Sequence, residues 1–165
     1  MEHTLDIDGW RTNLRFSACH MLVRHQKCSR IHGHSYAIHL RLRGETDENH
    51  YLFDFGVAKK KLREFAKELD HRVIIPTGSD EIRTENDRKN GRVVVDMAGK
   101  RYVFPEEDVI LIPTRASTVE ELSSYLLNRL VAELVLPSGV KQISLGIDEG
   151  PGQGAWSTID IEKDE

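Results

Sequence analysis

Alternating apolar and polar residues predict strands in two neighbouring parts of the chain. Residues 14–20 alternate up to His20, and in residues 32–43 the apolar positions continue the parity of His32 and His34. A period of two places successive side chains on opposite faces of a strand. Each predicted strand therefore buries the face that carries its histidines and exposes the other.

A first amphipathic helix follows these strands. Asp54 can cap its start, and the helical spacing ends at Asp70-His71. The predicted buried stripe is Ala58, Leu62, Phe65, Ala66 and Leu69.

A second helix is predicted later in the chain. It starts at Ser117 or Thr118, with Glu120 or Glu121 completing a capping box, and ends before the Pro-Ser-Gly of residues 137–139. Its predicted apolar stripe is Val119, Leu122, Leu126, Leu130 and Leu134.

Strand-like alternation returns at Ile143, Leu145 and Ile147, leading to Glu149. A glycine-rich turn over residues 150–154 then leads to a last strand near residues 155–161. Between the helices, residues 76–113 are polar and irregular, apart from a predicted hairpin of residues 92–96 and 101–104 around Gly99.

This order of elements predicts an α+β fold, a four-stranded antiparallel sheet with two helices on one face. Residues 1–165 should form one domain, with residues 76–113 as a decorated connection between the helices. Because a four-stranded sheet has open edges, we expect edge-to-edge assembly of several copies into a larger ring.

Composition narrows the class of protein. The 165 residues have a net charge of −4, 39% hydrophobic and 30% charged residues, which is typical of one soluble globular domain. The slight acidity argues against a nucleic-acid binder. The chain has neither an apolar run of membrane-spanning length nor a signal-peptide pattern near its start. Two cysteines form no disulfide framework, so we expect a reduced, cytoplasmic setting.

Three histidines are the strongest chemical signal. If the first two strands pair antiparallel, His20 ends one strand where His32 and His34 begin the next, all on one face. Three imidazoles without a fourth protein ligand indicate a catalytic zinc site with an open position. A His-x-His pair alone would favour a purely structural role, but the third histidine at the same end favours the metal. We expect His3, His25, His39 and His50 to be surface or loop residues.

Cys28 lies in the connector between these strands, within reach of the metal end. The nearby cations Arg24, Lys27 and Arg30 would favour a thiolate, although an inert thiol fits its position equally well. Asp70-His71 could form an acid–imidazole pair for proton transfer, but position alone favours an ordinary helix end.

Glu149 continues the parity of an apolar face, so its carboxylate must be paired or bind a ligand. It suits the adjacent N–H and amino donors of a guanine-like or pterin ring. Glu120 has an equally good structural explanation, a capping box with Ser117.

In these motifs the sequence resembles the family of 6-pyruvoyl- and 6-carboxy-tetrahydropterin synthases. The resemblance rests on residues 16–20, on Cys28 followed by His32-Gly33-His34, on residues 54–55, 69–71 and 118–120, and on Glu149. The sequence departs from the family pattern at two positions. Gly150 stands where the family usually has Thr after the glutamate, and Cys19 stands where it usually has a small residue before the first histidine. Residues 76–113 are also longer than the family pattern.

The resemblance implies the tunnelling fold, with sheets of several subunits joined into a barrel and active sites between subunits. It implies zinc on His20, His32 and His34, and proton transfer by Cys28, Asp70 and His71. Glu149 and Glu120 would bind the pterin.

The implied substrate is 7,8-dihydroneopterin triphosphate. The three residues between Cys28 and His32 resemble enzymes that make 6-carboxy-tetrahydropterin with loss of triphosphate and acetaldehyde, as in 7-deazaguanine (queuosine or archaeosine) synthesis. A 6-pyruvoyl product is the alternative, and a non-catalytic, zinc-stabilised pterin- or purine-binding oligomer is the rival from another class.

Overall fold

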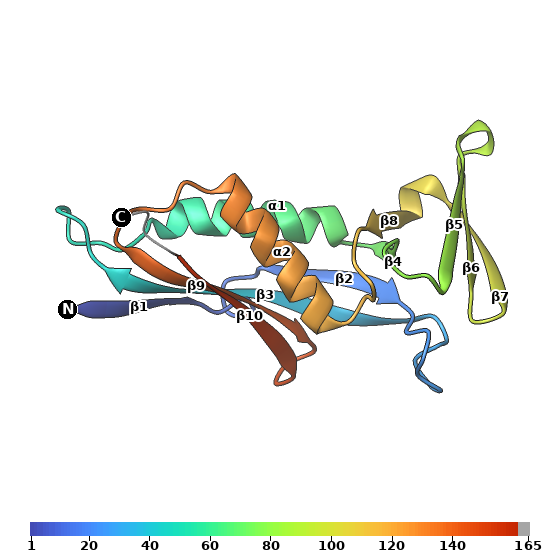
Figure 1. Cartoon of the computed structure of the whole chain (residues 1–165), viewed down its shortest axis with the longest axis horizontal. Helices are drawn as coiled ribbons and strands as arrows, with labels where there is room; N and C mark the ends of the chain where they lie inside the picture. Colours follow the sequence, from blue (N-terminus) through green and yellow to red (C-terminus); the bar gives the residue numbers. More distant parts are fainter. Residues whose placement is uncertain (162–165) are drawn as a thin grey trace.

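The computed structural model describes residues 1–161, in which two helices cover one face of a large twisted sheet (Figure 1). Helix α1 spans Phe55–Leu69 and helix α2 spans Val119–Glu133. Neither these nor any other helix in the described part is both long and apolar enough to cross a membrane.

The large sheet has seven strands in the order β10-β9-β3-β2-β4-β8, with β1 also paired to β3. Its pairs are antiparallel except β2 with β4 and β4 with β8, which are parallel. The strands are β1 (Glu2–Ile7), β2 (Arg15–His20), β3 (His32–Glu45), β4 (Arg72–Pro76), β8 (Val109–Ile112), β9 (Val140–Glu149) and β10 (Gly154–Asp160).

The expected four strands are all present as β2, β3, β9 and β10, but the expectation of a four-stranded antiparallel sheet is wrong. The sheet is larger and mixed. Strand β1 was not predicted because most of its residues are exposed, so its sequence lacks a clear alternation of apolar and polar positions. Strands β4 and β8 are short and continuously apolar at their centres, a pattern that does not distinguish a strand from a buried helical segment.

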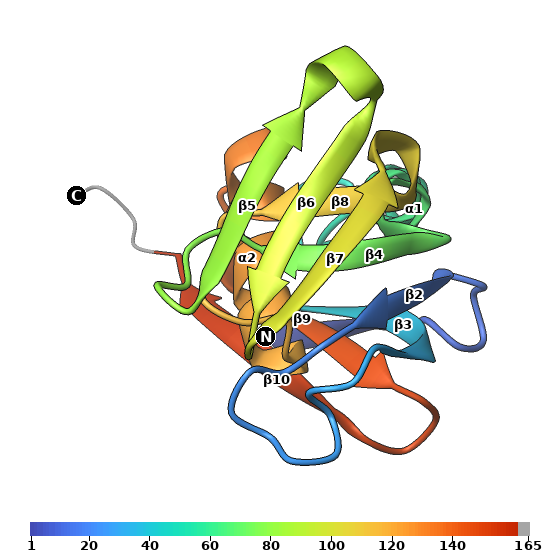
Figure 2. The ribbon, with the colours of Figure 1, turned by 90° about the vertical axis from the view of Figure 1, so that its right-hand side faces the viewer.

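A second sheet stands at one end of the molecule (Figure 2). It consists of β5 (Ile82–Asp87), β6 (Arg92–Met97) and β7 (Lys100–Pro105) in antiparallel order. The hairpin predicted around Gly99 is confirmed as β6 and β7. The remainder of residues 76–113 is more regular than expected, because it also contains β5 and β8.

Helix α1 forms as its sequence predicts. The Asp54 carboxylate accepts hydrogen bonds from the backbone N–H groups of Gly56 and Val57, and the whole predicted stripe is buried. At the start of α2, Thr118 is the capping residue and accepts from the Glu121 backbone N–H. The Glu121 carboxylate accepts from the Arg115 backbone N–H rather than from the capping residue.

The main core lies between the helices and the sheet. Phe16 and Ala18 from β2 meet alternate residues of β3 and β9 there, as the predicted parity requires. A separate cluster lies under the second sheet and includes Met21, which follows β2 directly. The other buried members of this cluster are Ile75, Ile82, Val93, Val95, Met97 and Val109.

One histidine expected on the surface is buried instead. His39 is 8% exposed on the sheet face opposite the helices. Its Nδ1 accepts from the Gly9 backbone N–H, and its Nε2 lies 3.2 Å from Asp148 Oδ2. The expectation fails because residues 8–14 fold across this face, where Trp10 also donates to Asp148. The other three, His3, His25 and His50, are exposed as predicted.

Candidate metal and pterin site

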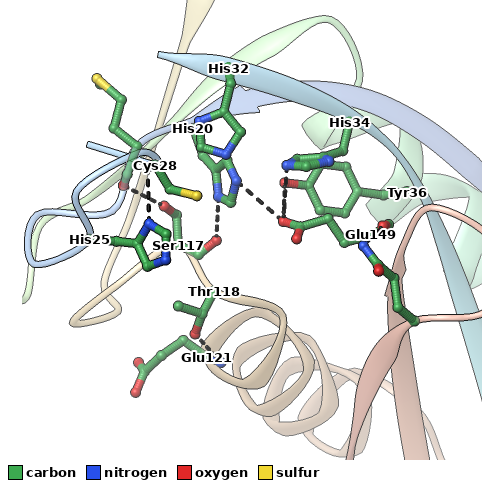
Figure 3. A network of polar contacts seen from close by, with 12 residues as sticks. His20, His25, Cys28, His32, His34, Tyr36, Ser117, Thr118, Glu121 and Glu149 are labelled. Atoms are coloured by element: carbon green, nitrogen blue, oxygen red, sulfur yellow. Dashed lines mark hydrogen bonds and ion pairs between the residues drawn. The ribbon is translucent and has the colours of Figure 1, made fainter. Parts of the chain in front are cut away.

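Strand pairing brings the three candidate metal ligands together. His20 and His32 are direct cross-strand partners at the end of the β2–β3 pair, and His34 follows on the same face of β3. One ring nitrogen from each histidine lies within 4.8 Å of those of the other two. His20 is buried, and His32 and His34 are half-buried (Figure 3). The convergence predicted from strand parity is therefore present.

Hydrogen bonds orient two of these rings for metal binding. His20 Nδ1 lies 2.8 Å from the Ser117 carbonyl oxygen, and His32 Nδ1 lies 2.8 Å from the Arg30 carbonyl oxygen. A carbonyl only accepts, so each Nδ1 carries the proton and each Nε2 keeps a free lone pair. Burial is the largest influence on His20: it lowers the pKa of this residue and so favours the neutral ring that a metal needs.

Two buried nitrogens of this cluster form no hydrogen bond with the described part of the protein, although the Glu149 carboxylate lies close to both. Within the described residues, Nε2 of His20 and Nε2 of His34 make no hydrogen bond. Unsatisfied buried polar atoms are rare, so their convergence on one point fits a missing ligand. Three neutral imidazoles suit a divalent transition metal such as zinc and leave a coordination position open.

Glu149 closes the site at the end of β9. Its Oε1 lies 3.2 Å from His20 Nε2 and 3.4 Å from His34 Nε2, close but outside hydrogen-bond geometry. The same oxygen accepts from the Tyr36 hydroxyl at 3.3 Å. Burial and the charge of Glu149 raise the pKa of Tyr36 above its usual value, so this hydroxyl stays a donor.

Tyr36 is the site residue that sequence reasoning missed. It lies within residues 32–43 on the face predicted to carry His32 and His34, but the alternation alone gives no sign that its hydroxyl has a polar partner. Cross-strand pairing with Glu149 gives it a polar contact as well. The signal was present in the alternation of β3, but the partner strand was needed to recognise it.

Cys28 lies in the connector beside the histidines, as expected. Its backbone N–H donates to His25 Nδ1 at 3.0 Å, and its carbonyl accepts from the Leu22 backbone N–H. These bonds hold the connector in a compact turn. Figure 3 shows the half-buried Cys28 side chain extending from this turn toward His20.

Asp70 and His71 form the predicted pair, with His71 Nδ1 2.8 Å from Asp70 Oδ2. The other Asp70 oxygen accepts from the Ser17 backbone N–H. Partial burial opposes ionisation, but these hydrogen bonds lower the pKa of Asp70 below its usual value. His71 adopts a left-handed φ of 58° and its side chain is 83% exposed.

This pair is not joined to the histidine cluster within one chain. Among residues 1–161, no hydrogen bond or ion pair connects Asp70 or His71 with Cys28 or His20. Ser17, which anchors Asp70, precedes His20 by three residues, or about 10 Å of strand.

Glu120 is not brought to the cluster either. It is exposed in the first turn of α2, and the capping box with Ser117, which was the structural explanation for Glu120, does not form. Ser117 is fully buried and donates its hydroxyl to the Met21 carbonyl, while Thr118 takes the capping position. The Ser117 hydroxyl is not available to cap the helix because it is bonded to Met21.

Gly150, where the family usually has Thr, follows Glu149 with a left-handed φ of 89°. A β-branched residue is strongly disfavoured in this conformation, so glycine suits the local turn.

Comparison with known proteins agrees with this geometry. Residues 10–159 match the family model for 6-pyruvoyl tetrahydropterin synthase. A Methanocaldococcus jannaschii protein named "Putative 6-carboxy-5,6,7,8-tetrahydropterin synthase" is 36% identical, covering 92% of this chain and 93% of its own. An Aquifex aeolicus protein named 6-carboxy-5,6,7,8-tetrahydropterin synthase is 26% identical, covering 73% and 72%.

Solved structures show the same fold. The 6-pyruvoyl tetrahydropterin synthase of Plasmodium vivax superimposes with a TM-score of 0.88 at 30% identity, covering 98% of this chain and 99% of its own. The Plasmodium falciparum enzyme gives the same TM-score at 28% identity, covering 97% and 99%. The match over most of the chain, together with the histidine cluster, shows that this protein belongs to the 6-pyruvoyl tetrahydropterin synthase family.

Proposed function

We propose that this protein is a zinc-dependent lyase that converts 7,8-dihydroneopterin triphosphate and one water molecule to 6-carboxy-5,6,7,8-tetrahydropterin, triphosphate and acetaldehyde. The observation that carries the proposal is the cluster of His20, His32 and His34 facing Glu149 at one end of the sheet. The names of the Methanocaldococcus and Aquifex relatives support the carboxylated product. The short spacing between Cys28 and His32 supports it as well.

The three histidines would hold the metal through Nε2 of His20 and the converging nitrogens of His32 and His34. Zinc bound there would supply Lewis acidity to the hydroxyl groups of the substrate side chain. The carbonyl groups of Ser117 and Arg30 keep two of the rings in the required tautomer.

Cys28 would act as the base that removes a proton from the substrate side chain. Its thiol extends from a hydrogen-bonded turn toward the same histidines, so a side chain bound beside them lies within its reach. Cys19 is unsuited to this role because it lies on the opposite face of β2 from His20.

Glu149 would anchor the pterin ring. Its carboxylate reaches the open end of the cluster and is held by Tyr36, so its second oxygen remains for a ring donor. Glu120 stays a candidate for the same role through the family resemblance alone.

Asp70 and His71 would relay protons in a site formed with a second copy of this chain. The pair is preformed and its imidazole is largely exposed, as a group that completes a neighbour's site would be. The proposed enzyme is therefore a homo-oligomer with active sites between subunits.

Formation of 6-pyruvoyl-tetrahydropterin is the second candidate, favoured by the titles of the two Plasmodium structures. The test is incubation of the zinc-loaded protein with 7,8-dihydroneopterin triphosphate and mass spectrometry of the products. We expect a carboxylated pterin with acetaldehyde and triphosphate released in equal amounts. A pyruvoyl pterin without acetaldehyde would establish the second candidate instead.

A further inference from the structure

The connector that carries Cys28 lies in a part of the chain without any acidic residue. Between Asp8 and Glu45 the sequence contains no Asp or Glu, although the whole chain has a net charge of −4. Within this stretch, residues 21–31 include Arg24, Lys27 and Arg30. Positive charge is thus concentrated around the proposed base.

Two of these cations lack an acidic partner. Arg24 pairs with Glu81 at 2.8 Å, with its side chain still 85% exposed. Lys27 and Arg30 are exposed and form no ion pair with any residue in the described range 1–161. They flank Cys28 at one residue before and two residues after it.

The second sheet adds another unpaired cation at the same place. Lys100 begins β7, and its Nζ lies 3.5 Å from the carbonyl oxygen of Ser29, the residue after Cys28. Figures 1 and 2 show the β6–β7 turn directed toward the connector and the β5–β6 turn directed away from it. Among the described residues 1–161, Lys100 forms no ion pair.

Hydrophobic packing maintains this arrangement. Met21, at the start of the connector, is 2% exposed and belongs to the buried cluster under the second sheet, with Val23 packed against it. Met97, three residues before Lys100, belongs to the same cluster. The β6–β7 turn and the connector are therefore joined through a shared core, not only through a surface contact.

Asp80, Glu81 and Asp96 line the same surface hollow as Lys100, but among the described residues none of them forms an ion pair with Lys27, Arg30 or Lys100. Like charges without ion-pair partners repel one another, and a bound anion with several charges removes this cost. We propose that Lys27, Arg30 and Lys100 form a binding site for a polyphosphate chain beside Cys28, and that the β5–β7 sheet serves to supply Lys100. The identification of this polyphosphate as the substrate's triphosphate rests on the proposed function. Its binding here would hold the leaving group next to the base.

The test is calorimetric titration of the purified protein with inorganic tripolyphosphate. Lys100→Met removes the charge and keeps the length of the side chain, and Lys89→Met removes a charge at the opposite end of the same sheet. We expect the affinity of Lys100→Met to fall about tenfold, as for loss of one charge-assisted contact. Lys89→Met should match the parent, and Lys100→Arg should restore most of the affinity.

Metal content and melting temperature are measured in every variant, because tripolyphosphate also binds metals. Equal affinity of Lys100→Met and the parent at equal metal content would overturn the proposal, as would failure of Lys100→Arg to restore binding. This readout needs no turnover. Lys100-dependent binding without conversion of the pterin would contradict the proposed function alone, and conversion with Lys100-independent binding would contradict the polyphosphate site alone.

Discussion

His20 and His32 are opposite one another across the β2–β3 pair, with ring centroids 4.6 Å apart. Their Nδ1 atoms are held by two different carbonyl groups, one from the start of α2 and one from the connector. The histidine cluster is thus tied to three parts of the fold, and its ring orientations are set before any ligand binds. Such preorganisation favours tight metal binding.

Replacing His32 and His34 together by Ala should abolish metal binding and activity, because one imidazole cannot hold zinc. The measurement is metal content by mass spectrometry after zinc loading and desalting. His3→Ala, an exposed histidine outside the cluster, is the control and should keep its metal. Stoichiometric zinc in the double variant would contradict the assignment.

Glu149→Gln should weaken pterin binding by about 2–3 kcal/mol while leaving metal content unchanged. The amide keeps the shape of the side chain but replaces one acceptor oxygen with a donor. Binding of a pterin to the zinc-loaded protein, followed by fluorescence, measures the effect. Unchanged pterin affinity would show that Glu149 is only a structural partner of Tyr36. Loss of metal would show that the carboxylate close to His20 is a ligand.

Cys28→Ala should retain zinc and the folded structure but lose turnover, because the base is removed and the histidines are untouched. The matched control is Cys19→Ala, which removes a thiol from the other face of β2 and should remain active. The measurement is the rate of triphosphate release by the two variants. Full activity of Cys28→Ala would show that Cys28 is not the base, and the absence of triphosphate release by the parent itself would favour the non-catalytic binding protein.

Asp70→Asn should destabilise the protein at neutral pH, with the difference from the parent shrinking on acidification. The pKa of Asp70 is lowered in the folded state, so its stabilising contribution is fully present above the unfolded value of about 3.9 and is lost as the pH falls through the lower folded value. Urea unfolding at neutral pH and at about pH 3 measures this. Glu107→Gln, an exposed residue of the 3-10 turn Glu106–Asp108, should show no such trend. A pH-independent difference would contradict the role of the charge.

Met21→Ala should reduce the free energy of unfolding by about 2–4 kcal/mol, since it opens a cavity in the cluster shared by the connector and the second sheet. Val103→Ala, on the 52% exposed Val103 of β7, should change it by less than about 1 kcal/mol. Thermal or urea unfolding of both variants measures the free energy of unfolding of each. Similar stabilities would show that the second sheet is not packed firmly on the connector.

The alternation of β2 and β3 was enough to predict that the histidines converge. Parity along a strand is set by the backbone, and a direct turn back through the connector makes the antiparallel pairing of His20 and His32 a local event. The α1 stripe and its Asp54 cap were predictable for the same reason. These features depend on residues close together in the chain.

Features that depend on distant residues were not predictable. Strands β4 and β8 join the sheet through parallel pairs, whose partners are far apart in sequence and whose short apolar runs have no period of their own. His39 is buried because the segment around Gly9 and Asp148 from β9 meet on it. Alternation alone predicts that a polar residue on this face of a strand is exposed to solvent. Only the tertiary structure shows that another segment packs over it.

The sequence by itself therefore determined which residues can act as metal ligands and on which face they lie. Only the tertiary structure decided that Glu149 and Tyr36 meet at the open side of these ligands, and that Asp70 and His71 form a pair at Ser17, away from the histidines. It also placed Lys100 against the carbonyl of Ser29, the residue after Cys28. The physical reason is that backbone periodicity acts within one element, whereas these contacts require burial of side chains from several elements in one core.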